Sequence, residues 1–311
     1  MAASVTFRAL ATAPPGVIQE VPCAVCGADD VDLRHTKASP EGEIFPIVRC
    51  RRCGLVYVSP RRRPDTLVVL YRRSAYFRTK QQVVSGYSDY IADGELHRTF
   101  FRHQLHQIER YVKSGRLLDV GCAMGFLLDE ARRRGWQTQG VDLSEFASNY
   151  ARAELGLPVF TGLLRDARYP DGHFDAVVMD DVIEHVGDPE AELAEVRRIL
   201  RPGGVVLLHT PNADSFSYRV SGRHWVHLKP GEHLVYFSPR TLTALLEKLG
   251  FQTKESHASG KPTNLRYIAL RVPRYGKTIG LIAQAIVRWI PFSRAAFPFR
   301  TGEMELLAVR R

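Results

Sequence analysis

Four of the five cysteines form two pairs with the same spacing, Cys23-Ala-Val-Cys26-Gly27 and Cys50-Arg-Arg-Cys53-Gly54, with 23 residues between them. Two thiols three residues apart in a tight turn can face one ion, and the following glycine permits the positive φ that such a turn often needs. Two such pairs supply the four thiolates of a closed, tetrahedral zinc site. The pattern predicts structural zinc, with redox or disulfide pairs and an iron–sulfur cluster as alternatives.

A second chemical pattern lies between an expected strand at 116–120 and an expected helix from Phe126, where Gly121-Cys122-Ala123-Met124-Gly125 forms a glycine-rich turn. Glycines there let the backbone approach a ligand, and the helix N-terminus offers N–H donors. Asp142 ends the next strand, 23 residues after Asp119. That spacing suits a carboxylate that accepts hydrogen bonds from ribose hydroxyls. Leu128 stands where a dinucleotide site would place its third glycine, and Cys122 is expected to pack under a strand end.

Alternating strands and helices are needed to position these groups. The hydrophobic pattern predicts strands at 116–120, 138–142, 159–164, 174–179, 205–208, 251–256 and 303–309. It predicts helices at 64–71, 95–112, 126–134, 189–200 and 241–249, with a further helix after the N-cap Ser144. Strands that alternate with helices indicate a doubly wound α/β sheet with parallel strands.

The cysteine pairs define a smaller unit ahead of this sheet, with short strands expected at 44–49 and 55–58. Such a ribbon has too small a core to fold without its metal. We therefore expect a flexible tail at 1–19, a zinc ribbon at 20–62, a helical linker or cap at 63–114 and the α/β domain at 115–311, with an insertion at 259–302. A weak transit peptide is the alternative for the tail.

Composition and charge limit the classes of protein and of binding partner that are possible. The 311 residues are 45% hydrophobic and 24% charged, which excludes disorder, and we find no apolar run long enough to span a bilayer. Residues 1–116 carry 18 basic and 11 acidic residues, residues 117–258 carry 15 and 20, and the insertion 259–302 carries 8 and none. Basic surfaces attract phosphates of nucleic acid, lipid head groups or nucleotide-linked substrates. We expect a cytoplasmic protein.

Residues 115–258 and the strand near 303–310 resemble the class I S-adenosylmethionine-dependent methyltransferases. The resemblance is carried by LLDVGCAMGFLL, GVDLS, PDGHFDAVVMDDVIEHVGDP, ILRPGGVVLLHTPN and EHLVYFSPRTLTALLEKLGF. It implies a seven-stranded Rossmann-like sheet and S-adenosylmethionine as cofactor. It also implies the cofactor-binding residues Asp119, Gly121, Cys122, Ala123, Gly125, Phe126, Asp142, Leu143, Leu163, Leu164, Asp180 and Asp181. Ala123 replaces the family's middle glycine, and Leu163-Leu164 occupy the place where an acid often contacts the adenine.

A methyl donor of this kind is already activated, so the enzyme mainly aligns the acceptor and excludes water, and a general base helps when the acceptor is a hydroxyl. By resemblance, the base is expected among His185 and Glu184, which follow the strand 174–179, and His233 and Tyr236, which lie over the cofactor. Packing histidines and a capping loop are the alternatives. Asp181-Val-Ile-Glu184-His185 also resembles the magnesium-binding pattern of ubiquinone-type O-methyltransferases, in which Glu stands in place of Asp181.

Within the insertion, Tyr275 to Ile290 has apolar residues at helical spacing, flanked by basic residues. A basic amphipathic helix can lie on a membrane surface, and the alternative is a helix that covers a sheet edge. The apolar residues are Ile279, Ile282, Ala283, Ile286 and Trp289.

We expect a small-molecule methyltransferase that acts on a sugar, phenol or natural-product hydroxyl or on an activated carbon. Ribbons of this kind precede the catalytic core in bacterial sugar and natural-product methyltransferases, and the acceptor can be phosphorylated, nucleotide-linked or lipid-linked. An RNA base methyltransferase that binds RNA through its basic zinc module is the alternative, since residues 1–116 are basic and include Arg61-Arg62-Arg63. A binding protein that kept only the fold is a third alternative.

Overall fold

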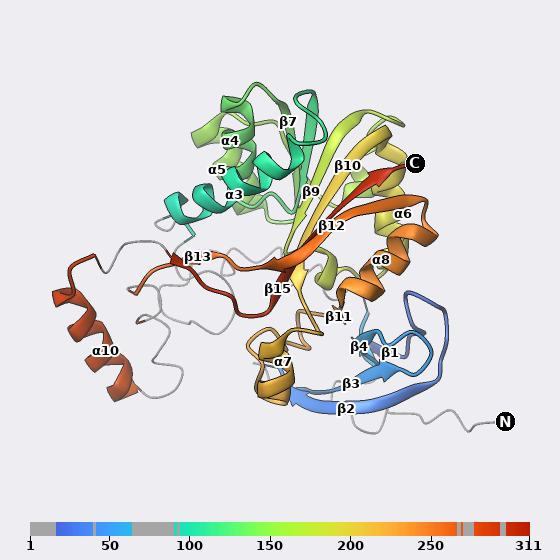
Figure 1. Cartoon of the computed structure of the whole chain (residues 1–311), viewed down its shortest axis with the longest axis vertical. Helices are drawn as coiled ribbons and strands as arrows, with labels where there is room; N and C mark the ends of the chain where they lie inside the picture. The colour runs from blue at the N-terminus through green and yellow to red at the C-terminus, as the bar shows by residue number, and fades with distance from the viewer. Residues whose placement is uncertain are drawn as a thin grey trace.

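The computed structural model describes residues 17–39, 42–63, 90–91, 94–265, 269, 277–292 and 297–311 (Figure 1). The expected helix at 64–71 lies outside these residues, as does nearly all of the expected tail. A seven-stranded sheet forms the centre, with the strand order β12-β15-β10-β9-β6-β7-β8. Its strands are β6 (Arg116–Val120), β7 (Gln137–Asp142), β8 (Val159–Thr161), β9 (Phe174–Asp180), β10 (Leu200–Pro211), β12 (Phe251–Ser259) and β15 (Glu303–Arg310).

Five neighbouring strands, β10, β9, β6, β7 and β8, pair in parallel, whereas β15 is antiparallel to both β10 and β12. The sheet is therefore mixed, and the expected Rossmann-like methyltransferase architecture is confirmed. The hydrophobic pattern locates β15 but carries no information on its direction. That direction depends on the route of the insertion, which leaves β12 at Ser259 and enters β15 at Glu303, its register partner, so the chain turns back from the same end of the sheet.

Helices cover both faces of the sheet (Figure 1). One face carries α3 (Gly94–Ile108), α4 (Phe126–Arg133) and α5 (Glu145–Leu155), and the other carries α6 (Pro189–Ile199) and α8 (Pro239–Lys248). Successive residues of a strand point to opposite faces. Leu117 accordingly packs in the core with α3, α4 and α5, and Leu118 packs in the core with α6 and α8. The apolar run of β6 thus serves two cores.

Side-chain caps fix several helix starts close to where the sequence places them. The Ser144 hydroxyl accepts a hydrogen bond from the Ala147 N–H at 3.3 Å, which confirms the N-cap of α5. The Asp188 carboxylate caps α6 just before Pro189. Ser238 and Thr241 form a reciprocal capping box at the start of α8.

The N-terminal ribbon shares a sheet with the larger domain. Its strands are β1 (Ile18–Gln19), β2 (Val31–Ala38), β3 (Ile44–Cys50), β4 (Val56–Val58) and β5 (Arg61–Arg62). The strand order β11-β4-β3-β2 adds β11 (Val235–Tyr236), which comes from the segment after β10. Phe45 and Ile47 pack with Trp225 and Tyr236 in one buried cluster. The ribbon is therefore fastened to the segment that holds His233 and Tyr236.

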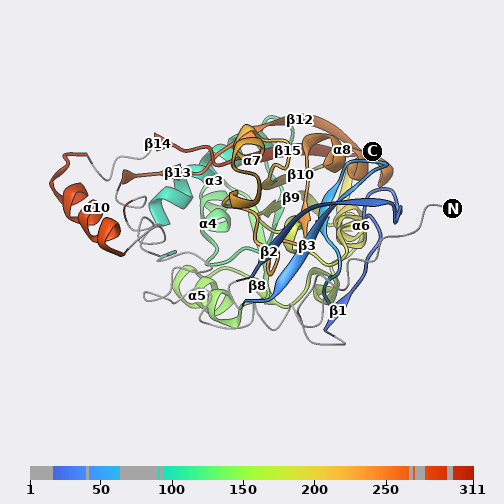
Figure 2. The same cartoon turned by 90° about the horizontal axis from the view of Figure 1, so that it is seen from below.

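The remaining elements are α7 (Phe216–Ser221), β13 (Pro262–Thr263), α10 (Lys277–Trp289) and β14 (Phe297–Pro298), with 3-10 turns η2 (Leu164–Ala167), η3 (Ile183–His185) and η4 (Gly222–His224). β13 pairs with β14, so the insertion leaves and returns side by side. Seen from the side and from below, α10 lies well apart from the central sheet (Figures 1 and 2). In the part of the chain that the structure describes, no helix is both long and apolar enough to cross a bilayer.

Candidate functional site

The expected cofactor-binding residues follow the carboxyl ends of four adjacent strands. Val120 of β6 is level with Val141 of β7 and with Met179 of β9, and Asp142 is level with Thr161 of β8. Asp119, Asp142 and Asp180 therefore stand at one edge of the sheet, beside the turns that hold Leu143 and Leu163. Ligands of open α/β sheets bind at this edge.

The glycine-rich turn adopts the conformation that its composition predicts. Gly121 has φ 75°, Ala123 has φ 46° and Gly125 has φ 79°. A Cβ atom on Gly121 would lie 2.4 Å from Val182 Cγ2, and one on Gly125 would lie 2.7 Å from Leu157 Cδ1. A side chain at either position would thus meet both a steric clash and an unfavourable backbone angle, which favours glycine. Ala123 holds a left-handed angle at a cost of about 1 kcal/mol.

Asp142 is clamped by backbone donors. Its Oδ2 accepts the Ala123 N–H at 2.8 Å, and its Oδ1 accepts the Ser144 N–H at 2.7 Å. The first bond ties the end of β7 to the glycine-rich turn, so the strained Ala123 and the carboxylate position each other. Burial raises the pKa of Asp142 to about 6, although both N–H groups favour the charged form.

The other residues of this edge are largely enclosed. Burial and the nearby charges of Asp180 and Asp142 raise the pKa of Asp119 well above its usual value. Cys122 and Phe126 are buried, and Leu164 begins the turn η2 with 1% of its surface exposed. Asp119 and Asp142 are buried and Asp180 is half-buried. Acids close together favour a cationic ligand, because the charge of each carboxylate opposes ionisation of the next.

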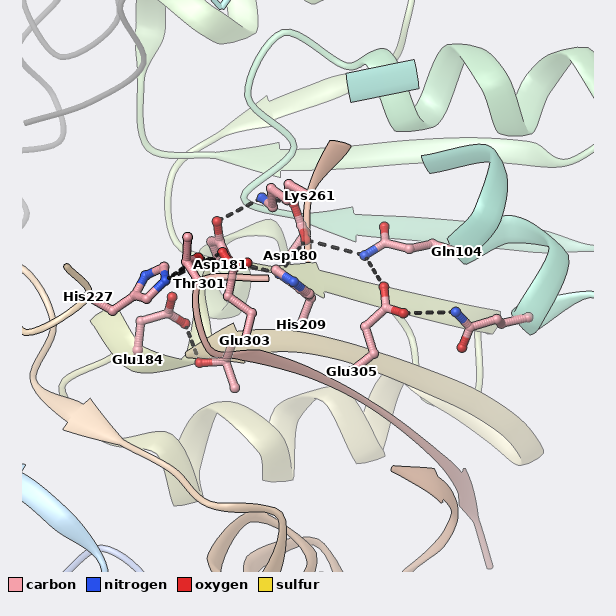
Figure 3. Close-up of polar contacts among 12 residues, drawn as sticks. Gln104, Asp180, Asp181, Glu184, His209, His227, Lys261, Thr301, Glu303 and Glu305 are labelled. Atoms are coloured by element: carbon pink, nitrogen blue, oxygen red, sulfur yellow. Dashed lines mark hydrogen bonds and ion pairs between the residues drawn. The ribbon is translucent and has the colours of Figure 1, made fainter. Parts of the chain in front are cut away.

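Asp180 and Asp181 share two cationic partners, as Figure 3 shows. Lys261 Nζ lies 2.9 Å from Asp180 Oδ2 and 2.8 Å from Asp181 Oδ2. His209 Nδ1, fully buried at the end of β10, lies 3.0 Å from Asp180 Oδ1 and 2.9 Å from Asp181 Oδ1. Burial opposes these charges, yet the carboxylates raise the pKa of His209, and Lys261 and His209 lower the pKa of Asp181. Asp181 holds φ 54°, so this cluster also fixes a strained turn.

A second layer of polar contacts supports this cluster. Gln104 Nε2 donates to Asp180 Oδ1 at 3.3 Å and to Glu305 Oε1 at 2.9 Å. Gln107 donates to the other Glu305 oxygen at 2.8 Å. On the opposite side, Thr301 Oγ1 lies 2.8 Å from His227 Nε2 and donates to Glu303. The residues that contact Asp180 and Asp181 thus come from α3, β10 and the insertion, and Glu305 of β15 contacts Gln104 behind them.

Glu184, His185 and His233 form a separate buried group whose ligand atoms lie within 4.8 Å of one another. His185 Nδ1 lies 3.0 Å from the carbonyl oxygen of Glu232. A carbonyl only accepts, so Nδ1 carries the proton and Nε2 is the basic nitrogen, 3.9 Å from Glu184 Oε1. Burial lowers the pKa of His185 to about 4, and burial with the charge of Asp181 raises the pKa of Glu184 to about 8. At neutral pH, His185 is a neutral imidazole and Glu184 is largely protonated.

The structure splits the sequence Asp181-Val-Ile-Glu184-His185 between two groups. Asp181 contacts His209 and Lys261. Glu184 instead lies beside His185 and His233, and its Oε2 accepts a hydrogen bond from Thr210 Oγ1 at 2.9 Å. The Lys261 ammonium already occupies the position between the two carboxylates where a cation would bind. The arrangement therefore gives no support to a magnesium site built on Asp181, Glu184 and His185 together.

The two expected residues of the downstream segment lie beside this group. The His233 ring contacts the His185 ring edge-on, with centroids 4.6 Å apart. Burial lowers the pKa of His233 well below its usual value, and burial raises that of Tyr236, so both side chains are neutral. His233 Nδ1 has no hydrogen-bond partner within the described ranges. Both residues come from the segment that joins the ribbon sheet.

The four cysteines of the ribbon gather as a metal site requires. All four sulfurs lie within 4.8 Å of one another, with Cys23 Sγ 3.3 Å from Cys53 Sγ and Cys26 Sγ 3.5 Å from Cys50 Sγ. The Gly27 N–H donates to the Cys23 carbonyl and the Gly54 N–H to the Cys50 carbonyl, at 2.8 and 2.9 Å. The two knuckles thus have the same fold, with φ 71° and 85° at their glycines. Tetrahedral zinc with bonds of about 2.3 Å needs sulfurs about 3.8 Å apart, which this set can supply.

Comparison with known proteins agrees with this geometry. A family model described as a methyltransferase domain matches residues 94–256, and the chain belongs to that family. The chain is 33% identical over 152 residues to "Ubiquinone biosynthesis O-methyltransferase" of Thiobacillus denitrificans, which covers 45% of this chain and 66% of that protein. It is 35% identical over 164 residues to "Probable S-adenosylmethionine-dependent methyltransferase" of Mycolicibacterium smegmatis, which covers 50% and 60%. The chain thus spans less than two-thirds of these curated relatives.

Among solved structures, an S-adenosylmethionine-dependent methyltransferase from Archaeoglobus fulgidus matches 71% of this chain and 99% of its own, with 18% identity and a TM-score of 0.48.

Sequence reasoning missed the cationic partners of Asp180 and Asp181. Lys261 lies 80 residues after Asp181, and its one signal is that it is the first basic residue of an insertion with no acid. His209 stands within an apolar strand, where a lone histidine is a usable signal. Gln104, Glu303 and Glu305 carry no motif, and only the assembled sheet shows their contacts.

Proposed function

We propose that the protein transfers a methyl group from S-adenosylmethionine to a hydroxyl of a small-molecule acceptor, and that Cys23, Cys26, Cys50 and Cys53 hold a structural zinc ion. The proposal rests chiefly on the buried carboxyl groups of Asp119 and Asp142 and the half-buried carboxylate of Asp180 at the ends of adjacent strands. A cationic nucleoside cofactor matches that charge. The names of the curated relatives support O-methylation as the reaction type.

In this proposal the glycine-rich turn and Asp119 hold the methionine end, and Asp142 accepts hydrogen bonds from the ribose hydroxyls. Asp142 is suited to that role because its backbone partners fix both oxygens in place. Phe126, Leu143, Leu163 and Leu164 border the nucleoside, and Asp180 faces the sulfonium. When bound, the cofactor supplies an electrophilic methyl group. The protein contributes alignment and exclusion of water.

His185 is the proposed general base. Its Nε2 carries no proton at neutral pH, and its orientation is fixed by the Glu232 carbonyl. As the acceptor oxygen forms its bond to the methyl carbon, the carbon–sulfur bond breaks and its electron pair stays on sulfur. The hydroxyl proton passes to His185 Nε2. Glu184, His233 and Tyr236 line the acceptor position as neutral groups.

The test measures release of S-adenosylhomocysteine with a panel of phenols, sugars and polyketide alcohols, together with the mass of the methylated product. His185→Gln should lower kcat by about 100-fold while the affinity for S-adenosylmethionine stays unchanged within a factor of about two. His224→Gln is the matched control, because His224 is exposed in the same part of the fold. Full activity of His185→Gln would show that His185 is not the general base. Failure of the folded protein to bind S-adenosylmethionine would disprove the proposed methyl transfer as a whole.

A further inference from the structure

The helix α10 presents large apolar side chains to solvent. Ile282, Ile286 and Trp289 follow one another at spacings of four and three, so they share one helix face. Their exposed fractions are 55%, 56% and 88%, and Leu281 beside them is 68% exposed. Phe292, just beyond the helix, is 88% exposed. The sequence left open whether this helix covers a sheet edge, and in the structure its apolar face does not do so.

The charge of the surrounding segment restricts what can cover this face. Residues 259–302 carry eight basic residues and no acidic one. A second copy of the chain would bring a second strongly basic segment to the contact, which opposes self-association. A nucleic acid would neutralise the charge but leave the apolar face in water. An anionic lipid surface matches both properties, because its phosphates pair with Lys and Arg while its acyl boundary takes up the apolar face.

The aromatic residues strengthen this match. Trp289 and Phe292 lie at the C-terminal end of the apolar face, and Arg288 is exposed beside them. Aromatic rings next to basic side chains are typical of the boundary between lipid head groups and acyl chains. The length of α10, from Lys277 to Trp289, suits a helix that lies in this boundary rather than one that spans it.

We propose that α10 docks on the surface of an anionic lipid bilayer, with Leu281, Ile282, Ile286, Trp289 and Phe292 inserted at the head-group boundary. The insertion begins at the site described above, since Lys261 contacts Asp180 and Asp181. The proposal does not depend on methyl transfer, because lipid binding is measured directly.

Trp289 supplies a natural probe. Trp136 and Trp225 are buried, with 3% and 1% of their surfaces exposed, so Trp289 is the exposed tryptophan of the chain. The full-length protein is mixed with vesicles of phosphatidylcholine and phosphatidylglycerol, with vesicles of phosphatidylcholine alone, and with vesicles of the mixture that contain brominated phosphatidylcholine. We expect the emission to shift to shorter wavelength with the mixed vesicles, to be quenched by the brominated lipid, and to change far less with phosphatidylcholine alone.

Two variants add one negative charge to opposite sides of the same helix. Ile286→Asp places it on the apolar face, and Gln284→Asp places it two residues away on the other side. In co-sedimentation with the mixed vesicles, Ile286→Asp should weaken binding by at least about tenfold, and Gln284→Asp should have a much smaller effect. Both positions are in the exposed helix, so circular dichroism should show the same fold as the wild type.

Three results would overturn the proposal. One is an unchanged Trp289 emission with the mixed vesicles. Another is equal binding by Ile286→Asp and Gln284→Asp. The third is a dimer in the absence of lipid that Ile286→Asp converts to a monomer, because it would assign the apolar face to a second copy.

Discussion

The two sides of the proposed site hold their carboxylates in different ways. On the cofactor side, defined by Asp119, residues 121–125 and Asp142, Asp142 is held by backbone N–H groups of Ala123 and Ser144. On the acceptor side, defined by Asp181, Glu184, His185, His233 and Lys261, Asp181 is held by the side chains of His209 and Lys261. Any sequence that folds the turn provides the backbone N–H donors, whereas each cationic side chain requires a particular residue at a particular position. The cofactor side therefore depends on the backbone of the folded turn, and the acceptor side depends on individual side chains.

The ribbon belongs to the acceptor side through the pairing of β4 with β11. If its cysteines bind zinc, Cys53→Ser should remove nearly all of the metal, because structural zinc contributes about 10 kcal/mol or more to the folding of such a unit. Hydrogen exchange should then show lost protection in β3, β4 and β11. The affinity for S-adenosylmethionine should change by less than about threefold, since the cofactor side makes its contacts within the sheet.

Metal analysis and calorimetric titration check this prediction, and Cys122→Ser is the control for the metal analysis because Cys122 lies outside the cluster of four thiols. Full zinc content in Cys53→Ser would disprove the four-cysteine site. A cofactor affinity that falls together with the zinc content would show that the two sides are not separable.

Asp142→Ala tests the cofactor side alone. The carboxylate is expected to accept two hydrogen bonds from ribose hydroxyls, and bonds to a charged group contribute about 1.5–3 kcal/mol each. The dissociation constant for S-adenosylmethionine should therefore rise by at least about 100-fold. Asp214→Ala, in an exposed turn, should leave it unchanged. Isothermal titration of both variants measures these dissociation constants. A rise of less than about fivefold for Asp142→Ala would place the ribose elsewhere.

Lys261→Met tests the acceptor side. The substitution removes one cationic group that contacts Asp180 and Asp181 and leaves His209. Both carboxylates are partly exposed, so we expect a loss of about 1–2 kcal/mol in the free energy of unfolding. The lowered pKa of Asp181 means that its stabilisation is present above about pH 4 and is lost at lower pH. Urea unfolding at neutral pH and below about pH 4 should show the difference between wild type and variant shrinking in acid. An equal difference at both pH values would mean that Lys261 acts through packing instead.

The same contrast explains what could be predicted from the sequence. Asp119, Gly121, Gly125 and Asp142 belong to one short stretch, so their spacing predicted a common edge and the structure brings them together. The strands and helices of the sheet were confirmed because their hydrophobic periods are local. The pairing of Lys261 with Asp181 spans 80 residues and depends on the course of the insertion. No local pattern contains that information.

The docking of the ribbon on β11 was missed for a related reason. Val235 and Tyr236 form a strand of two residues, too short to have a period, and their partners Val56 and Tyr57 lie in another expected domain. Glu184 and His185 were found as neighbours in sequence, but Asp181 could be separated from them only by its positive φ and its distant cations. The expected roles of these residues therefore stay predictions, while their positions are established.

The smallest expected effect concerns the protonation of the cofactor side. Burial raises the pKa of Asp142 to about 6, so its carboxylate is charged at neutral pH and protonated in mild acid. Only the charged form can accept a hydrogen bond at both oxygens from hydroxyl donors. The affinity for S-adenosylmethionine should thus fall from about pH 7 to about pH 5 by up to about tenfold, which corresponds to one pH unit below the pKa. Asp142→Asn should bind more weakly and show a flat profile over that range. Because the acceptor-side group Asp181 has a lowered pKa and stays charged throughout, a flat profile in the wild type would mean that the ribose contact is not carried by Asp142.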